Sequence, residues 1–279
     1  MAAIQVTDSR QLLLCSNPDP QTGRVLNGSK KSRVVYTIPG LLNKDISSTT
    51  HLSIRLLHAE IPHSLYTVTS VNNLLRIIVG ATTYDIEITY GNYSGDSLIN
   101  FLQAWFDANA SSLNMEITLS QIDGKLTFAS TSSFSISGES TCGKLLGFDL
   151  GETSIYDSSL AKHVLICPNL LDLSGIKSIH IRCPSLSFSS FNTLTRVDDV
   201  LRSIPVSCEP FGVIMWNDSI GSDLVIKSIF QSNDLEIYMV DGSTGLELDF
   251  NGCDWLLTLE IRKHQFIQST LAYLGSDGI

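Results

Sequence analysis

Three side chains that could bind a metal ion lie close together near residue 60. His58 and His63 are five positions apart, and Glu60 lies between them. Imidazole nitrogens and carboxylate oxygens are common metal ligands, but they must converge on one point. In an extended segment, His58 and Glu60 share one face and His63 points to the other. The spacing therefore favours exposed strand residues near a bend over a metal centre.

Motifs for covalent or cofactor chemistry are missing from the sequence. A Ser or Cys nucleophile needs a His base, and no GxSxG elbow or protease-like cysteine signature occurs. No P-loop or GxGxxG is present either. Asp249 and Asp254 flank Asn251-Gly252, which predicts turn capping rather than a glycosidase acid pair. We predict no catalytic, cofactor-binding or metal-binding residue and no enzymatic activity, although a triad built from distant residues would leave no motif.

The sequence predicts a reducing compartment for the six cysteines. The first residues lack a secretory signal, no stretch reaches 18 apolar residues, and the cysteines form no CxxC pair. We therefore expect no membrane span and predict six free thiols that are mostly small buried side chains. The six are Cys15, Cys142, Cys167, Cys183, Cys208 and Cys253.

Charge argues against nucleic acid as a partner. The formal net charge is −10, and the one basic cluster is Lys30, Lys31 and Arg33. A phosphate backbone repels such a chain, so we predict no direct nucleic-acid contact. Charged residues make up only 16% of the chain, against about a quarter in typical domains. Low charge suits a surface covered by neighbouring subunits, and a Ser- and Thr-rich β monomer would have the same composition.

Short strands dominate the hydrophobic pattern. His51, Ser53 and Arg55 alternate with Leu52 and Ile54, which is typical of a strand with one buried face. Similar runs recur between turn signals, with no alternating helices, which excludes a parallel α/β fold. The sequence predicts an all-β jelly-roll sandwich. Its other expected strands are Arg33–Ile38, Val164–Cys167, Lys177–Cys183, Val197–Pro205, Phe211–Trp216, Asp223–Phe230, Leu235–Val240 and Trp255–Arg262.

One segment contains the only convincing helix. Apolar residues three and four apart predict a helix over Asp96–Asn109, with its N-cap at Ser94 or Gly95. A hairpin pattern precedes this helix and another follows it, so we predict a small inserted α+β module over 72–150. The remaining boundaries are an arm over 1–30, the jelly roll over 31–71 and 151–264, and a tail over 265–279.

Several motifs, taken in order, resemble a known family of viral proteins. They are His58-Ala59-Glu60-Ile61-Pro62-His63-Ser64-Leu65-Tyr66 with Asn72-Asn73, Gly91-Asn92-Tyr93-Ser94 with Leu98, Leu145-Leu146-Gly147-Phe148, Leu171–Ile176 with Ile179–Arg182, Ile204-Pro205-Val206, and Asp249–Gly252 with Asp254-Trp255 and Leu257–Ile261. Their order and spacing over residues 51–262 resemble the penton and minor-capsid jelly-roll proteins of virophages, Polinton-like viruses and nucleocytoplasmic large DNA viruses.

The resemblance implies a structural protein of the virion that is assembled in the host cytoplasm. It implies a homo-pentamer at icosahedral vertices that contacts a double-jelly-roll major capsid protein, and an inserted module that meets a host receptor or fibre. A non-vertex minor capsid protein stays open. So does a receptor- or carbohydrate-binding sandwich such as a fibre head, for which Trp216 and Tyr93 are the candidate aromatics; Trp105 and Trp255 occupy predicted core positions.

Overall fold

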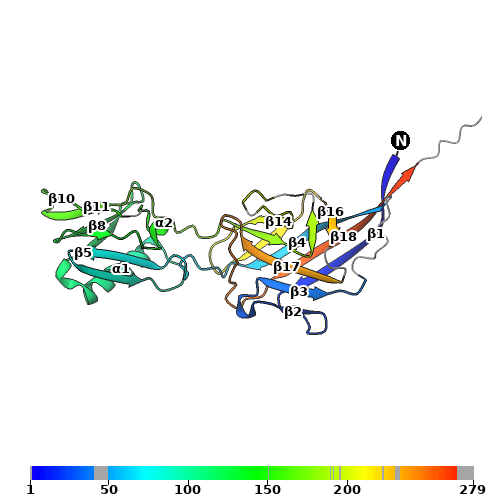
Figure 1. Cartoon of the computed structure of the whole chain (residues 1–279), viewed down its shortest axis with the longest axis horizontal. Coiled ribbons are helices and arrows are strands. Elements are labelled where there is room, and N and C mark those ends of the chain that lie inside the picture. Colours follow the sequence, from blue (N-terminus) through cyan, green and yellow to red (C-terminus); the bar gives the residue numbers. More distant parts are fainter. Residues whose placement is uncertain are drawn as a thin grey trace, which may run out of the picture. The chain divides into compact units, whose positions relative to one another are not determined.

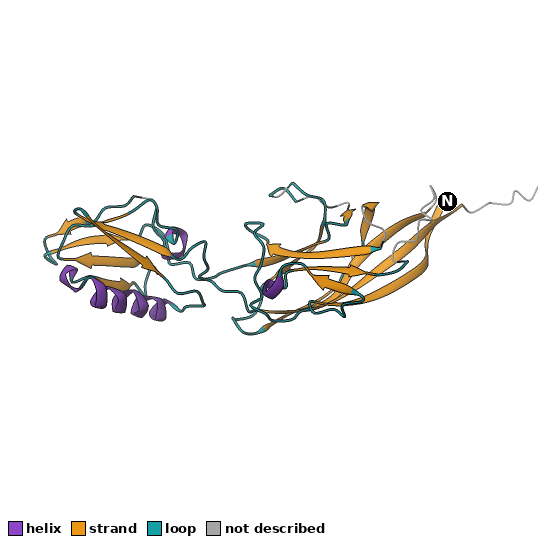
Figure 2. Cartoon of the chain, turned by 60° about the horizontal axis from the view of Figure 1, so that its bottom comes forward, coloured by secondary structure: helices purple, strands orange, loops and turns teal. Residues whose placement is uncertain are grey.

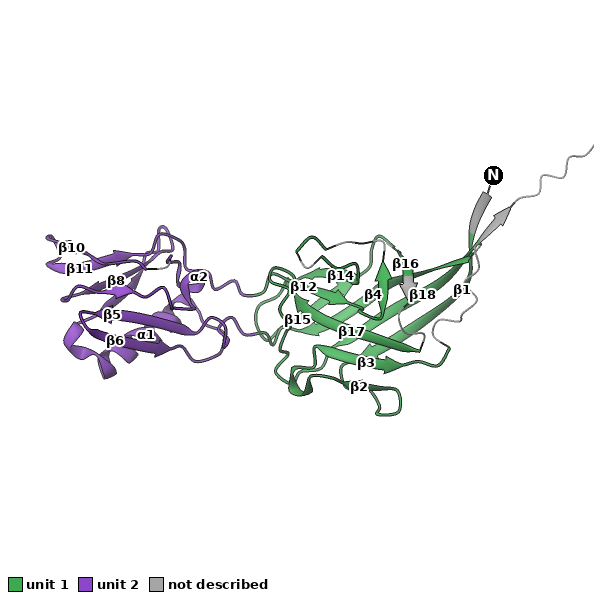
Figure 3. Cartoon of the chain, in the orientation of Figure 1, with its two compact units in different colours: residues 1–65, 176–279 green, residues 66–175 purple. Residues whose placement is uncertain are grey.

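The chain forms two compact units in a computed structural model (Figure 3). Unit 1 comprises Met1–Leu65 and Ile176–Ile279, and unit 2 comprises Tyr66–Gly175. The structure describes residues 2–40, 50–149, 151–188, 190, 192–194, 196–221, 223–229 and 233–268. In this described part, no helix has the length and apolar character that crossing a bilayer requires.

Unit 1 is built almost entirely of strands (Figure 1). Its elements are β1 (Ala2–Cys15), β2 (Gly23–Val25), the 3₁₀ turn η1 (Gly28–Lys30), β3 (Arg33–Thr37), β4 (Thr50–Pro62), β12 (Ser178–Arg182), β13 (Leu186–Phe188), β14 (Val200–Pro205), β15 (Val213–Asn217), β16 (Leu224–Ile229), β17 (Asp234–Asp241) and β18 (Leu256–Gln268).

The strands of unit 1 pair in a nested order. One sheet runs β1-β18-β4-β16-β13, with β15 also paired to β4, and the other runs β14-β12-β17-β3-β2. The pairs β1 with β18, β3 with β17, β4 with β15 and β16, and β12 with β14 are all antiparallel. This nesting of outer around inner strands defines a jelly roll. The predicted all-β jelly roll is confirmed.

The core of unit 1 lies between the two sheets. Leu52, Ile54 and Leu56 of β4 point inward, while the polar residues between them point outward. Trp255 is fully buried, and its Nε1 donates to the carbonyl of Lys31 at 2.8 Å. Alternation along the strands thus gives each sheet one apolar and one polar face.

The prediction of an N-terminal arm over residues 1–30 is wrong. Ala2–Cys15 forms β1, the edge strand of the first sheet, and Gly23–Val25 forms β2. Leu12 and Leu14 enter the core, but residues 5–11 are exposed. An edge strand with both faces exposed has no apolar alternation, so the sequence pattern does not predict β1.

Unit 2 combines two small sheets with a helix that lies along its strands (Figure 2). One sheet runs β10-β11-β8-β7 and the other β6-β5-β9. The elements are β5 (Leu74–Val79), β6 (Thr82–Glu87), α1 (Gly95–Asn109), the 3₁₀ turn η2 (Ser111–Leu113), β7 (Glu116–Leu119), β8 (Leu126–Ser130), β9 (Ser135–Ile136), α2 (Gly143–Leu146), β10 (Ile155–Asp157) and β11 (Lys162–Ile166).

Helix α1 begins as the sequence predicts. Ser94 is the N-cap, and its side chain and that of Ser97 each accept a backbone N–H of the other, which completes a capping box. Leu98, Leu102 and Phe106 are buried in the core of unit 2. Trp105, predicted as a core residue, is half-buried and packs against that core.

The inserted unit is larger than the predicted module over 72–150. It extends over 66–175, because β11 pairs with β8 and β10 pairs with β11. The strand expected over Val164–Cys167 therefore belongs to unit 2 rather than to the jelly roll. At the other boundary, β18 continues to Gln268 along β1, so part of the predicted tail is strand; residues 269–279 lie outside the described residues.

Candidate functional site

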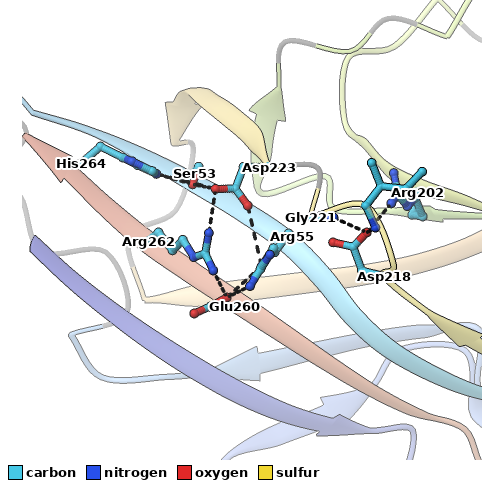
Figure 4. A network of polar contacts seen from close by, with 10 residues as sticks. Ser53, Arg55, Arg202, Asp218, Gly221, Asp223, Glu260, Arg262 and His264 are labelled. Carbon is cyan, nitrogen blue, oxygen red and sulfur yellow. Dashed lines mark hydrogen bonds and ion pairs between the residues drawn. The ribbon is translucent and has the colours of Figure 1, made fainter. Parts of the chain in front are cut away.

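The outer face of the β1-β18-β4 sheet holds a network of charged side chains (Figure 4). Strand pairing sets Arg55 opposite Glu260 and Ser53 opposite Arg262. Arg55 Nη2 lies 2.7 Å and Arg262 Nη2 lies 3.0 Å from Glu260 Oε2. The Glu260 side chain is only 9% exposed, although it points away from the core. Two arginines thus neutralise one covered carboxylate.

Asp223 ties the segment before β16 to this network. Its carboxylate lies 3.7 Å from Arg55 Nε and 3.3 Å from Arg262 Nη1, and it accepts a 3.3 Å hydrogen bond from Ser53. Among the described residues, strand β16 pairs with β4 through two register positions, Leu224 with Ile54 and Val225 with Ser53. The ion pairs therefore supplement a short ladder.

The environment of the network shifts the pKa values of two of its members, Glu260 and His264. Burial alone would raise the pKa of Glu260, but hydrogen bonds and charge from Arg55 and Arg262 outweigh burial and hold the pKa below its usual value. Burial, with the nearby charge of His51, lowers the pKa of His264. The folded state thus favours an ionised Glu260 and a neutral His264.

Ser53, His264 and Asp223 assemble a serine, a histidine and an aspartate in one place. The Ser53 hydroxyl lies 2.7 Å from His264 Nε2. Asp223 lies 3.9 Å from the same nitrogen, whereas a catalytic triad needs the aspartate on the other ring nitrogen. Ser53 is 1% exposed. The geometry is that of a packed polar cluster, and it offers no poised nucleophile.

A second polar cluster lies beside the first. Asp218, nearly inaccessible to solvent, accepts the backbone N–H of Ile220 and Gly221 and pairs with Arg202 Nη2 at 3.2 Å. The guanidinium of Arg202 stacks 4.7 Å from the ring centroid of Trp216. Asp218 thus holds the turn between β15 and β16, and Arg202 covers the indole that was a candidate sugar-binding aromatic.

The structure separates the three candidate metal ligands. His58 Nε2 lies 2.9 Å from Glu60 Oε1, on the outer face. His63 Nδ1 instead contacts the carbonyl of Cys208 at 2.8 Å. Hydrogen bonds that His58 donates to Glu60 and Asn217 raise the pKa of His58. Within the ranges that the structure describes, no three His, Cys, Asp or Glu residues gather in a way that could hold a metal ion.

The basic cluster near residue 30 is engaged within unit 1. Lys30 pairs with Glu247, Lys31 with Asp254 and Arg33 with Glu236. The cluster therefore fixes strands and turns.

The turn at Asn251-Gly252 behaves only partly as predicted. Both residues have positive φ, and Asp249 accepts the Asn251 N–H at 2.9 Å, so Asp249 caps the turn. Asp254 instead accepts the hydroxyl of Ser16 and the ammonium of Lys31. Strands β17 and β18 lie in opposite sheets, so the turn forms a corner rather than a hairpin.

All six cysteines are free. Cys142, Cys167 and Cys183 are buried, and Cys15 and Cys208 are half-buried. Cys253 is exposed, so the expectation of mostly buried thiols does not apply to it.

The chain is similar to known proteins in its structure rather than in its sequence. No protein-family model matches the chain, and no curated protein matches its sequence. A crystal structure of the mavirus penton protein is similar over 94% of this chain and 100% of that chain, with 12% identity and a TM-score of 0.46. VP17, a capsid protein of bacteriophage P23-77, covers 94% of this chain and 99% of its own, with 8% identity and a TM-score of 0.19. These two structures are of viral capsid proteins.

Proposed function

We propose that the chain is a structural subunit of a virus capsid. The observation that carries this proposal is the location of the family-like motifs at junctions of the fold. Residues 249–255 form the corner between the two sheets, residues 91–94 lead into the cap of α1, and residues 145–148 end α2. A fold alone does not specify function, and the ordered motifs at these junctions are therefore the support for the proposal.

The contacts at these junctions are structural. Ser64 donates its hydroxyl to the carbonyl of Phe250 at 2.7 Å, and the Asn251 amide donates to the carbonyl of Ser64 at 2.6 Å. In unit 2, Asn92 Oδ1 accepts the backbone N–H of Thr67 at 2.8 Å, and Gly91 pairs with Val68. These motif residues satisfy backbone groups, which supports a role in holding shape rather than in binding substrate.

The finer proposal is a penton. Five copies close a ring at an icosahedral vertex through heterologous contacts, which five-fold symmetry makes self-limiting. The ring contacts the double-jelly-roll major capsid protein, and unit 2 is the part that meets a receptor or a fibre. The fibre-head alternative has no observation in its favour, since Arg202 covers Trp216 and Tyr93 donates its hydroxyl to the carbonyl of Thr89.

Mass in solution tests the finer proposal. Light scattering of the purified chain should give a uniform particle of about 150 kDa, five times the chain mass, and electron microscopy should show five-fold rings. A monomer that stays monomeric when co-produced with the major capsid protein would contradict the penton. Absence of the chain from purified virions would contradict the capsid role itself.

A further inference from the structure

Three large apolar side chains on and beside β15 are exposed to solvent. Val213 is 53% exposed and Met215 is 55% exposed, while Ile214 between them is buried. Phe211, which precedes the strand, is 81% exposed. We call Phe211, Val213 and Met215 the β15 stripe. A contiguous group of this kind on a soluble protein marks an interaction surface more often than isolated apolar residues do.

The backbone of Phe211 is strained. Its φ is +69°, a left-handed conformation that is unfavourable for a residue with a side chain. The turn is fixed, since Phe211 N–H donates to the carbonyl of His63 at 2.8 Å and His63 N–H donates to the carbonyl of Gly212 at 2.8 Å. The exposed ring gains little burial within this chain to offset the strain. Backbone strain that no contact within the chain offsets is typical of a binding site.

One edge of β15 is open to a further strand. Val213 lies opposite Pro62, and proline has no N–H, so this is a non-hydrogen-bonded pair. The backbone N–H and C=O of Val213, and of Met215 by alternation, therefore point away from β4. In the described part of the chain, β4 is the one strand that pairs with β15. An open edge beside exposed apolar side chains can receive an extended segment.

Acidic residues near the β15 stripe indicate which kind of partner can bind there. Glu60 of β4, 42% exposed and hydrogen-bonded to His58, lies opposite Met215, and Glu209 is exposed two residues before Phe211. The whole chain has a formal net charge of −10. A second copy would bring further negative charge to an acidic rim, whereas a segment with basic ends would be attracted.

We propose that β15 binds an extended segment of a different protein by adding it to the sheet as a strand. The segment has apolar residues at alternate positions, which cover Phe211, Val213 and Met215, and Lys or Arg at its ends, which meet Glu60 and Glu209. This inference goes beyond the capsid proposal and holds without it.

Selection from displayed random peptides, with the full chain as bait, tests the inference. Enriched peptides should alternate apolar and polar residues, carry Lys or Arg at their ends and lack a central proline. A synthetic copy of the strongest peptide should bind Val213→Lys and Phe211→Gly at least roughly tenfold more weakly. It should also bind less tightly as salt increases.

Two controls separate lost binding from lost folding. Phe211→Gly relieves the left-handed strain, so it should keep or raise the thermal midpoint while it weakens binding. Ile122→Lys changes an apolar residue of unit 2 that is 99% exposed, and should leave binding unchanged. The inference is wrong if no peptide is enriched, if enriched peptides lack the pattern, or if Val213→Lys binds as well as the natural chain. It is also wrong if the chain self-associates and Val213→Lys abolishes that association, since the stripe would then contact a second copy.

Discussion

The imidazole rings of His51 and His264 lie stacked, with their centroids 4.6 Å apart and their planes 5° from parallel. The two residues are direct cross-strand partners on β4 and β18. Burial first, then His51 and Arg262, lower the pKa of His264, and Asp223 acts in the opposite direction. The balance disfavours a charged imidazole in the folded chain.

This relationship predicts that acid destabilises unit 1. Because the pKa of His264 is lower in the folded than in the unfolded chain, its contribution to the free energy of unfolding is complete above about pH 6.5. The contribution is lost as pH falls from there through the folded-state pKa. His264→Gln should therefore flatten the decline of stability between about pH 7 and pH 5 in urea titrations.

His58 provides a control with the opposite sign. Glu60 raises its pKa, so its contribution is present below the unfolded pKa and is lost as pH rises through the folded-state pKa. His58→Gln should make the acid decline steeper. Equal slopes for the natural chain and His264→Gln would contradict the assignment of the decline to the stacked pair.

Gly147→Ala should selectively destabilise unit 2. The residue has φ +82°, and an added Cβ would lie 2.4 Å from the carbonyl oxygen of Asn169 and 2.6 Å from that of Leu170. Backbone strain and overlap together should cost about 3 kcal/mol or more. Hydrogen exchange should show faster exchange across 66–175 and little change in unit 1.

Gly151 is the matched control for Gly147. It also has positive φ, +80°, but an added Cβ would have nothing within 4 Å. Gly151→Ala should cost only the strain of the left-handed conformation, about 1–2 kcal/mol. If both variants lose a similar amount of unfolding free energy, the close contact of the added Cβ at Gly147 does not contribute to the loss.

Trp255→Ala should remove the largest single anchor of unit 1. The side chain is fully buried, and truncating a buried tryptophan costs about 3–5 kcal/mol. Trp255→Phe should lose less, and chiefly the hydrogen bond to Lys31. Ile122→Ala, at a side chain 99% exposed, should change the unfolding free energy by less than about 0.5 kcal/mol. Chemical denaturation measures all three.

The cysteines should react in an order set by burial. Burial raises the pKa of the Cys142, Cys167 and Cys183 thiols to about 12, so few thiolates form in the folded chain. Iodoacetamide at mild alkaline pH should modify exposed Cys253 first, and these three only after denaturation. Early modification of Cys183, read by peptide mass spectrometry, would contradict this order.

Local pattern predicts much of the fold. The alternation from His51 to Arg55 gave β4, and the apolar spacing after Ser94 gave α1, because each pattern reports which side chains a sheet or helix buries. The edge strand β1 escaped prediction because residues 5–11 are exposed on both faces. The strand over Val164–Cys167 was assigned to the wrong unit, since periodicity reveals a strand but not its partner.

The polar network escaped sequence analysis for a related reason. Its members come from segments about 200 residues apart, so no spacing marks them as a group. One signal was available. Glu260, Arg262 and His264 recur every second residue beside buried Leu259 and Ile261, which is charge on the outer face of a strand. Ser53 and Arg55 repeat that signal on the partner strand.

The nested strand order also sets a sequence of events during translation. β1 leaves the ribosome long before its partner β18, whereas all strand pairing of unit 2 lies within 66–175. Contacts distant in sequence form late because closing a long loop costs entropy. We therefore expect the nascent chain to complete its inserted unit before β1 pairs with β18, and the jelly roll to close from the middle of the polypeptide outward.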